Sequence, residues 1–385
     1  MPAPAAARWP RCRSRRSCCI EAAGCGLFKK KVASAPDGQA QAAIKIEVTP
    51  YRAPAWLPGG QLQTLWPALH ARRVAGPRIA YRRERWDTPD GDFVDVDWLE
   101  PAAPAGAPLL VLFHGLEGSS RSHYAEAFAG WARSHGVGLA VPHFRGCSGE
   151  PNRAPRAYHS GDFAEVGWLL ARFQGAQRAR GGGPVLAVGV SLGGNALLRW
   201  AGEAGVSAGT LVAAVAAVCS PLDLAAGAQA IGRGFNRQVY TRLFLRSMKT
   251  KARAKLAQHP GLFDAGRLRA ARDLIAFDDL FTAPLHGFAG AGDYYRRASA
   301  KPVLADIRVP ALALNAQNDP FVPAASLPRA GEVGRHVTLW QPPEGGHVGF
   351  CQGRAPGHVF WLPRAVGGWL LAQAEVPARA GHASS

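Results

Sequence analysis

The sequence lacks any run of about 18 uninterrupted apolar residues, the length that a membrane-spanning helix needs. Its longest apolar stretches, such as residues 108–113, are only as long as a strand, so we expect no spanning helix. The chain is not disordered or fibrous in composition, since 48% of its 385 residues are hydrophobic and 19% are charged. A chain of this length and composition can bury a sizeable core and fits one large domain with an inserted subdomain.

Cysteine is also scarce. Of the seven cysteines, four lie within the first 25 residues, and Cys147, Cys219 and Cys351 are scattered singly. No pair among the first four has the two-residue gap of zinc sites and no histidine lies among them, so we expect neither a disulfide framework nor a metal site. This usage is typical of a reducing compartment, and we expect a cytoplasmic protein.

Acidic residues are few, 27 against 45 Lys and Arg, which gives a net charge of +18. Residues 1–31 hold eight of the 45 cations and a single acid. They have no apolar segment of a secretory signal, so we interpret residues 1–45 as a disordered basic tail or a start codon assigned too early. The other cations are dispersed and no nucleic-acid-binding motif accompanies them, so we expect no nucleic-acid partner. Residues 376–385 are expected to form a flexible C-terminus.

The hydrophobic pattern indicates an α/β fold. Residues 81–86 and 93–99 flank a turn and alternate in polarity, which predicts two antiparallel edge strands with one acidic face. From residue 108 onward, buried strands alternate with helices expected near 122–134, 161–172, 192–204 and 363–373. This rhythm predicts a mostly parallel sheet covered on both faces, built from residues 46–221 and 301–375. It breaks over residues 222–300, which we interpret as a helical lid or cap insertion.

The strongest motif is Gly189-Val-Ser-Leu-Gly193, between a predicted strand and a predicted helix. In this context G-x-S-x-G forms a nucleophile elbow, a sharp turn that only small neighbours such as Gly189 and Gly193 allow. Ser191 is therefore the candidate nucleophile. Because a serine hydroxyl is a weak nucleophile at neutral pH, this prediction requires a general base and a group that orients it.

In this fold the acid and then the histidine follow the serine along the chain. Asp319 follows a buried strand, and His347 follows the next one. Both lie at carboxyl ends of strands, where catalytic groups collect in α/β sheets. We expect the other candidates to be surface or packing histidines and acids that cap helices or pair with Arg: His159, His286, His358, Asp278, Asp279 and Asp293.

A tetrahedral oxyanion needs two backbone donors aimed at it. The residue after the nucleophile and the loop after the first central strand supply them in this fold. That loop is His114-Gly-Leu-Glu-Gly118, so the predicted donors are the N–H groups of Leu116 and Leu192. Gly115 would let the backbone turn inward, and His114 would shape the loop.

Several motifs together resemble one family. They are the run at residues 54–67, His114 to Ser119, Phe144-Arg-Gly-Cys-Ser-Gly-Glu150, the elbow, and residues 282–288 with 294–296. Over roughly residues 48–375 the chain resembles AB-hydrolase family 4, the YheT-like esterases. The resemblance implies an α/β-hydrolase fold and hydrolysis of carboxylic esters or acylglycerols by Ser191, Asp319 and His347. The family often has His where this chain has Gln61, a departure outside the triad.

Two features leave alternatives open. Residues 235–258 contain seven Lys and Arg and no acid, with apolar residues at helical intervals. This pattern favours a lid whose apolar face covers an acyl pocket, but it also fits contact with an anionic membrane surface or a solvated packing helix. Cys147 fits a small packing residue better than one lining the rim of the active site.

We therefore predict a serine hydrolase that cleaves short- to medium-chain carboxylic esters through an acyl-enzyme, with no metal or organic cofactor. The same residues would also serve a thioesterase or an amidase, because they attack any acyl carbonyl. A further alternative is a non-catalytic binding protein that keeps the fold and holds an anionic partner on its basic insertion. The substrate and the oligomeric state stay open.

Overall fold

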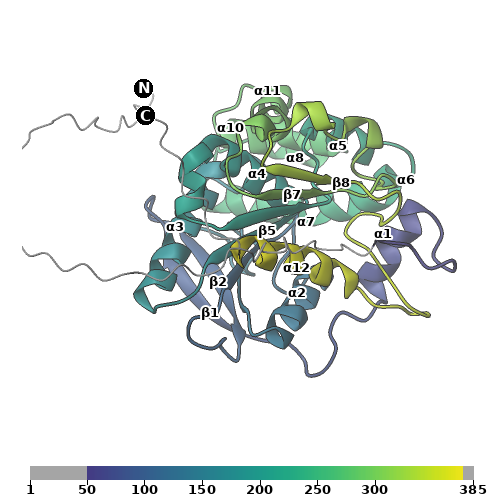
Figure 1. Cartoon of the computed structure of the whole chain (residues 1–385). Coiled ribbons are helices and arrows are strands. Elements are labelled where there is room, and N and C mark those ends of the chain that lie inside the picture. Colours follow the sequence, from purple (N-terminus) through teal and green to yellow (C-terminus); the bar gives the residue numbers. More distant parts are fainter. Residues whose placement is uncertain (1–49, 376–385) are drawn as a thin grey trace, which may run out of the picture. The chain divides into compact units, whose positions relative to one another are not determined.

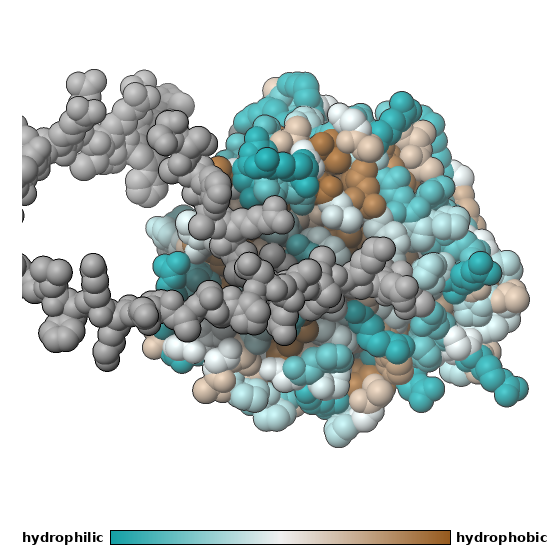
Figure 2. Space-filling view, in the orientation of Figure 1, coloured by the Kyte–Doolittle hydropathy of each residue, from teal (hydrophilic) through white to brown (hydrophobic). Residues whose placement is uncertain are grey.

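The computed structural model describes residues 50–375. The tail predicted for residues 1–45 and the flexible C-terminus predicted for residues 376–385 lie outside the described residues. Within residues 50–375, no helix combines the length and the apolarity needed to cross a bilayer. On the face drawn in Figure 2, hydrophilic residues predominate and strongly hydrophobic ones occupy a small area.

Eight strands form one sheet in the order β1-β2-β4-β3-β5-β6-β7-β8 (Figure 1). Strands β4 to β8 and β3 run parallel, whereas β2 is antiparallel to both of its neighbours. The strands are β1 (Ala80–Asp87), β2 (Phe93–Glu100), β3 (Leu109–Phe113), β4 (Gly138–Pro142), β5 (Val185–Val190), β6 (Ala214–Val218), β7 (Ala311–Leu314) and β8 (Val337–Trp340). Their order brings the carboxyl ends of β3, β5, β6, β7 and β8 to one edge, as parallel pairing requires.

The prediction of two edge strands is wrong for β2, which pairs with β1 on one side and with β4 on the other. Its expected acidic face is not solvated either, because Asp95 and Asp97 are buried. The guanidinium groups of Arg85 and Arg83, opposite them on β1, bind these carboxylates through paired hydrogen bonds of 2.7 to 2.9 Å. Alternation of acidic residues resembles a solvent face, but paired arginines make the same residues suitable for burial.

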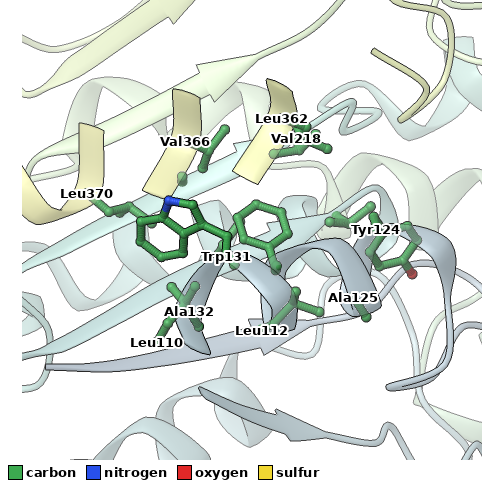
Figure 3. Close-up of a cluster of buried hydrophobic side chains, with 14 of the residues drawn as sticks. Leu110, Leu112, Tyr124, Ala125, Trp131, Ala132, Val218, Leu362, Val366 and Leu370 are labelled. Atoms are coloured by element: carbon green, nitrogen blue, oxygen red, sulfur yellow. The ribbon is translucent and has the colours of Figure 1, made fainter. Parts of the chain in front are cut away.

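Each face of the sheet has its own apolar core. Along β3, Leu110 and Leu112 point to one face and Val111 to the other. Figure 3 shows the first core, where Trp131 lies between side chains of β3 and the C-terminal helix. Helices α2 (His123–Ser134) and α12 (Trp361–Glu375) cover this face, and α3 (Phe163–Ala179) and α4 (Leu192–Ala204) cover the other. The predicted two-sided burial of continuous apolar strands is thus present.

Helices fill the stretch between β6 and β7. They are α5 (Leu224–Ile231), α6 (Gly234–Asn236), α7 (Arg242–Gln258), α8 (Ala265–Ala270), α9 (Leu274–Phe277), α10 (Ala283–Leu285) and α11 (Ala291–Ala298). Asp223, Asp264 and Asp273 begin α5, α8 and α9 by accepting backbone hydrogen bonds at their first turns, the usual action of an N-cap aspartate. Two π-helical segments, Arg237–Thr241 and Asp278–Thr282, interrupt the helical run.

Candidate active site

Ser191 lies at a strained turn between β5 and α4. Its backbone has φ 79° and ψ −109°, a conformation that side-chain-bearing residues rarely adopt and that is typical of functional sites. The chain closes tightly around it: a Cβ at Gly193 would lie 2.5 Å from the carbonyl oxygen of Phe113, and one at Gly189 would lie 2.4 Å from that of Gly193. Glycine is therefore required at both positions, as the motif predicts.

The loops after β7 and β8 bring an acid and an imidazole to this serine. The Nε2 atom of His347 lies 3.0 Å from the Oγ of Ser191. Its Nδ1 lies 2.8 Å from the Oδ2 of Asp319. The other carboxylate oxygen accepts backbone N–H groups of Phe321 at 2.8 Å and Val322 at 3.3 Å. The carboxylate is thereby fixed, and an imidazole that donates to it from Nδ1 presents Nε2 as the acceptor for the serine proton.

The rival residues lie elsewhere. The rings of His159, before α3, and His286, in the insertion, pack against each other at a tilt, with centroids 4.6 Å apart, and burial lowers the pKa of His159 to about 3. His358 stacks on Phe360 next to α12. These histidines therefore pack, as predicted.

The acids of the insertion differ among themselves. Asp293 pairs with Arg296 and Arg297, as predicted, and Asp279 accepts the N–H of Ala291 at the start of α11. The interpretation of Asp278 as a cap or an Arg partner is wrong. Its carboxyl binds the hydroxyl groups of two residues instead, Thr282 at 2.6 Å and Tyr295 at 2.7 Å.

Helix α1 (Gly59–Leu69) contacts both loops that carry Asp319 and His347, a role that the sequence left open. The Oγ1 of Thr64 accepts the backbone N–H of His347 at 2.8 Å. The side-chain oxygen of Gln63 accepts from the N–H of Gly345 and from the amide of Asn318, both at 2.9 Å. These partners are separated by more than 250 residues along the chain, so no local motif marks Gln63 or Thr64.

The residue that departs from the family pattern, Gln61, connects α1 with the insertion. Its amide donates to Asn236 at 2.8 Å, and its oxygen accepts from the hydroxyl of Tyr240 at 2.8 Å. Glutamine supplies both a donor and an acceptor without titrating near neutral pH. The segment that contains α1 therefore contacts the loops at the serine on one side and the insertion on the other.

The loop after β3 passes close to the serine. A Cβ at Gly115 would lie 3.2 Å from the Cβ of Ser191. The N–H of Gly115 donates to the hydroxyl of Tyr124 at 2.8 Å. Within residues 50–375, by contrast, the N–H groups of Leu116 and Leu192 have no hydrogen-bond partner. Leu192 is the first residue of α4, where a free N–H and the helix dipole favour negative charge.

His114 is fixed within the same loop. Its Nε2 accepts the N–H of Phe144 at 3.1 Å, so its Nδ1 carries the proton and donates to the carbonyl of Gly115 at 2.8 Å. Burial lowers the pKa of His114 to about 3. A neutral imidazole with both nitrogens occupied acts as a structural part of the loop.

A cavity of about 930 Å³ opens at the serine. The insertion supplies many of its apolar walls, including Leu224, Ile231, Phe244, Met248 and Phe281. Cys147 lies on the wall as well as packing against the core, and its Sγ is 3.3 Å from the Nζ of Lys251. Burial raises the pKa of this thiol to about 11, so it is neutral near neutral pH. The space suits an apolar group attached to the acyl carbon that the serine attacks.

Three potential metal ligands also meet here, since donor atoms of Cys219, Asp319 and His347 lie within 4.8 Å of one another. The two nitrogens of His347 already face Asp319 and Ser191. Burial and the nearby carboxylate raise the pKa of Cys219 well above its usual value, which disfavours the thiolate that a metal requires. This donor set therefore fits a proton-transfer chain better than a metal site.

Known proteins resemble this chain over most of its length. Residues 108–353 match a family model described as the alpha/beta hydrolase fold. The Escherichia coli (strain K12) protein named "Putative esterase YheT" is 40% identical over 317 residues, covering 82% of this chain and 91% of that protein. The Mus musculus protein named "Phospholipase ABHD3" is 28% identical over 310 residues, covering 78% and 73%.

A solved structure, the acylaminoacyl peptidase of Pyrococcus horikoshii, superimposes with a TM-score of 0.51 at 15% identity. The superposition covers 79% of this chain and 43% of the peptidase chain. At this level of identity the likeness concerns the fold alone.

Proposed function

Since this chain belongs to the α/β-hydrolase family and is an esterase similar to YheT, we propose that it cleaves carboxylic esters through an acyl-enzyme on Ser191. The observation that carries this proposal is the continuous chain of hydrogen bonds from Asp319 through His347 to Ser191, at 2.8 and 3.0 Å. This chain of hydrogen bonds ends at Ser191, whose side chain the strained elbow presents to the cavity.

In the proposed reaction, the Oγ of Ser191 attacks the ester carbonyl while His347 Nε2 takes its proton. The carbonyl oxygen becomes an oxyanion and accepts the free N–H groups of Leu116 and Leu192. His347 then returns the proton to the departing alcohol, leaving an acyl-enzyme. A water molecule then attacks the acyl carbon while His347 takes its proton. His347 passes this proton to the Oγ of Ser191 as the carboxylic acid leaves. Asp319 stays ionised throughout and stabilises the imidazolium.

The cavity supports an ester with an apolar acyl group as the substrate. Its volume of about 930 Å³ lies in the upper part of the range of small-molecule sites, and its insertion walls are largely apolar. We therefore propose short- to medium-chain acyl esters or acylglycerols, with the insertion as the lid over the acyl group. The name of the mouse relative adds phospholipids to this class. Contact of the basic insertion with a lipid surface belongs to the same proposal.

A fluorophosphonate probe tests the nucleophile directly, because it labels only an activated serine. We expect the modified peptide to contain Ser191, and we expect Ser191→Ala and His347→Ala to abolish labelling. Ser207→Ala removes an exposed serine on another surface and serves as the matched control. Turnover of p-nitrophenyl butyrate should follow the same pattern. Labelling of a different serine, or wild-type turnover no faster than that of Ser191→Ala, would refute the proposal.

A further inference from the structure

The residue after the proposed oxyanion donor carries an unusual set of contacts. Glu117 has φ 56°, a left-handed conformation that a residue with a side chain adopts at an energetic cost. Its side chain is only 10% exposed. Its carboxylate accepts from Lys251 Nζ at 2.9 Å, from the hydroxyl of Tyr158 at 2.9 Å, and from the hydroxyl of Ser247.

Two of these partners belong to the insertion. Ser247 and Lys251 are four residues apart on α7, so they lie on the same face of that helix. This face is turned toward the loop after β3, whereas Arg246 and Arg253 on the same helix are exposed. The carboxylate of Glu117 thus joins the loop next to the serine to the longest helix of the insertion.

The loop is held from the core side as well. Tyr124 of α2 accepts the N–H of Gly115 at 2.8 Å, and Tyr158 accepts the N–H of Glu117 at 3.0 Å. Leu116 lies between these two anchored amides, so the direction of its own N–H depends on both anchors. One anchor sits on a core helix, whereas the other, Tyr158, also donates to the carboxylate of Glu117 that α7 binds.

The ion pair between Glu117 and Lys251 of α7 involves a largely buried carboxylate. A largely buried carboxylate is costly unless a cation and hydrogen bonds compensate for lost solvation. Lys251 is the cation that meets it, and the pKa of Lys251 is raised even though burial alone would lower it. The thiol of Cys147 and the carboxylate of Glu117, which both accept from the Nζ of Lys251, together raise this pKa.

We propose that Glu117, Ser247 and Lys251 form a latch between helix α7 and the loop after β3. While α7 packs against this loop, the latch fixes the backbone conformation that directs the N–H of Leu116. When α7 is in place, the latch compensates for burial of the carboxylate and for the left-handed backbone of Glu117, and the N–H of Leu116 is directed at the oxyanion. When α7 moves away, the carboxylate loses its cation and the loop relaxes. The three latch residues are positioning residues, and this inference rests on the proposed esterase function.

The test compares Lys251→Met with Lys249→Met, a matched change on the same helix outside the cavity wall, where the Nζ of Lys249 donates to a carbonyl of α8. Outright loss of one oxyanion donor costs about 100- to 1,000-fold in kcat. We expect a displaced donor to cost about tenfold in kcat for p-nitrophenyl butyrate, with KM nearly unchanged. Glu117→Gln should lose a similar amount, and the double variant no more than either single one. Lys251→Arg should restore most of the activity, since it keeps the charge.

A second measurement separates positioning from a purely structural tether. In a trifluoromethyl ketone inhibitor, Ser191 Oγ adds to the ketone carbon, its proton passes to His347, and the new oxyanion faces Leu116 and Leu192. The inhibition constant of the ketone should be higher for Lys251→Met than for the wild type, by the same factor by which kcat falls. Ser247→Ala gives the same comparison if Lys251→Met proves too unstable to purify.

Three results would overturn the latch. One is a kcat in Lys251→Met equal to that in Lys249→Met. Another is a loss confined to KM or to melting temperature, with unchanged inhibition by the ketone, which is the result for a tether. The third is additive losses in the double variant. These outcomes leave labelling of wild-type Ser191 intact, whereas absence of that labelling removes the esterase function and the latch with it.

Discussion

Asp278 is a carboxyl group of the cavity wall, and within residues 50–375 it forms no ion pair. It sits at the start of a π-helical segment, and its partners in this part of the chain are the hydroxyl groups of Thr282 and Tyr295. Burial raises its pKa to about 6, although both hydroxyl groups oppose that rise. The folded protein therefore favours the protonated acid, whereas the unfolded chain ionises it near pH 4.

This difference sets the sign of a pH effect. Because the folded pKa is above the unfolded one, the stability from Asp278 is complete below about pH 4 and disappears as pH rises through about 6. Asp278→Asn keeps a polar partner for both hydroxyl groups and removes the titration. The unfolding free energy of the variant minus that of the wild type should be about 1 kcal/mol larger at pH 8 than at pH 5. Denaturant unfolding at both pH values measures it, and a constant difference would contradict the assignment.

Single residues differ in how far the sequence alone reveals them. Ser191 and its glycines could be predicted because the elbow imposes its steric demands within five neighbouring residues. Asp319 and His347 could be predicted from chain order, and the structure brings them to the serine, although their catalytic roles stay predictions. Thr64 could not be predicted, because its contact with the backbone of His347 exists only after residues 283 positions apart have folded together.

At the scale of elements, the two neighbouring residues at the start of α7 face different surroundings. Leu243 is 64% exposed at the mouth of the cavity. Phe244 is half-buried inside it and packs edge-on against Phe321, with ring centroids 6.3 Å apart. Phe321 in turn lies on the imidazole of His347 at 4.3 Å. A lid that covers the acyl group would therefore sense chain length through Phe244 rather than Leu243.

We expect Phe244→Ala to shift the preference toward longer acyl chains. One methylene in an apolar pocket changes kcat/KM by about 10- to 200-fold, so the ratio of kcat/KM for octanoate to that for butyrate should rise about tenfold. The ratio cancels any common loss that reaches His347 through Phe321. Leu243→Ala is the control and should change the ratio little. Equal ratios in wild type and Phe244→Ala would exclude the lid helix from the acyl site.

Elements were predictable where their signals are local and strong. The mostly parallel sheet covered on both faces was predicted correctly, because continuous apolar strands followed by helices leave few alternative topologies. That it is an α/β-hydrolase fold followed from the elbow motif and the family resemblance, and it is confirmed. The internal position of β2 was not predicted, since its pairing with β4 joins two strands that are separated in the sequence by β3 and α2. The helical pattern of residues 235–258 also conceals the π-helical segment Arg237–Thr241, because one extra residue in a turn hardly alters an amphipathic spacing.

At the scale of the molecule, exposed apolar side chains gather where α1 meets the insertion. Leu62 and Leu69 of α1 are 47% and 67% exposed, and Phe235 of α6 is 50% exposed. Gln61 and Asn236, the direct neighbours of Leu62 and Phe235, are hydrogen-bonded to each other, so the two apolar side chains belong to one region. Four exposed arginines lie near Phe235 along the chain: Arg233, Arg237, Arg242 and Arg246.

Exposed apolar side chains beside a segment rich in exposed arginines suit an anionic lipid surface, where each cation contributes about 1 kcal/mol. We expect sedimentation with vesicles of phosphatidylcholine and phosphatidylglycerol, little with phosphatidylcholine alone, and release as salt rises. Phe235→Ser should weaken partitioning about tenfold, or about 1.4 kcal/mol. Val206→Ser, a change at an 82% exposed residue after α4, should have no effect. Equal binding to neutral vesicles would contradict the role of the cations, and equal losses in both variants would mean that this region does not meet the bilayer.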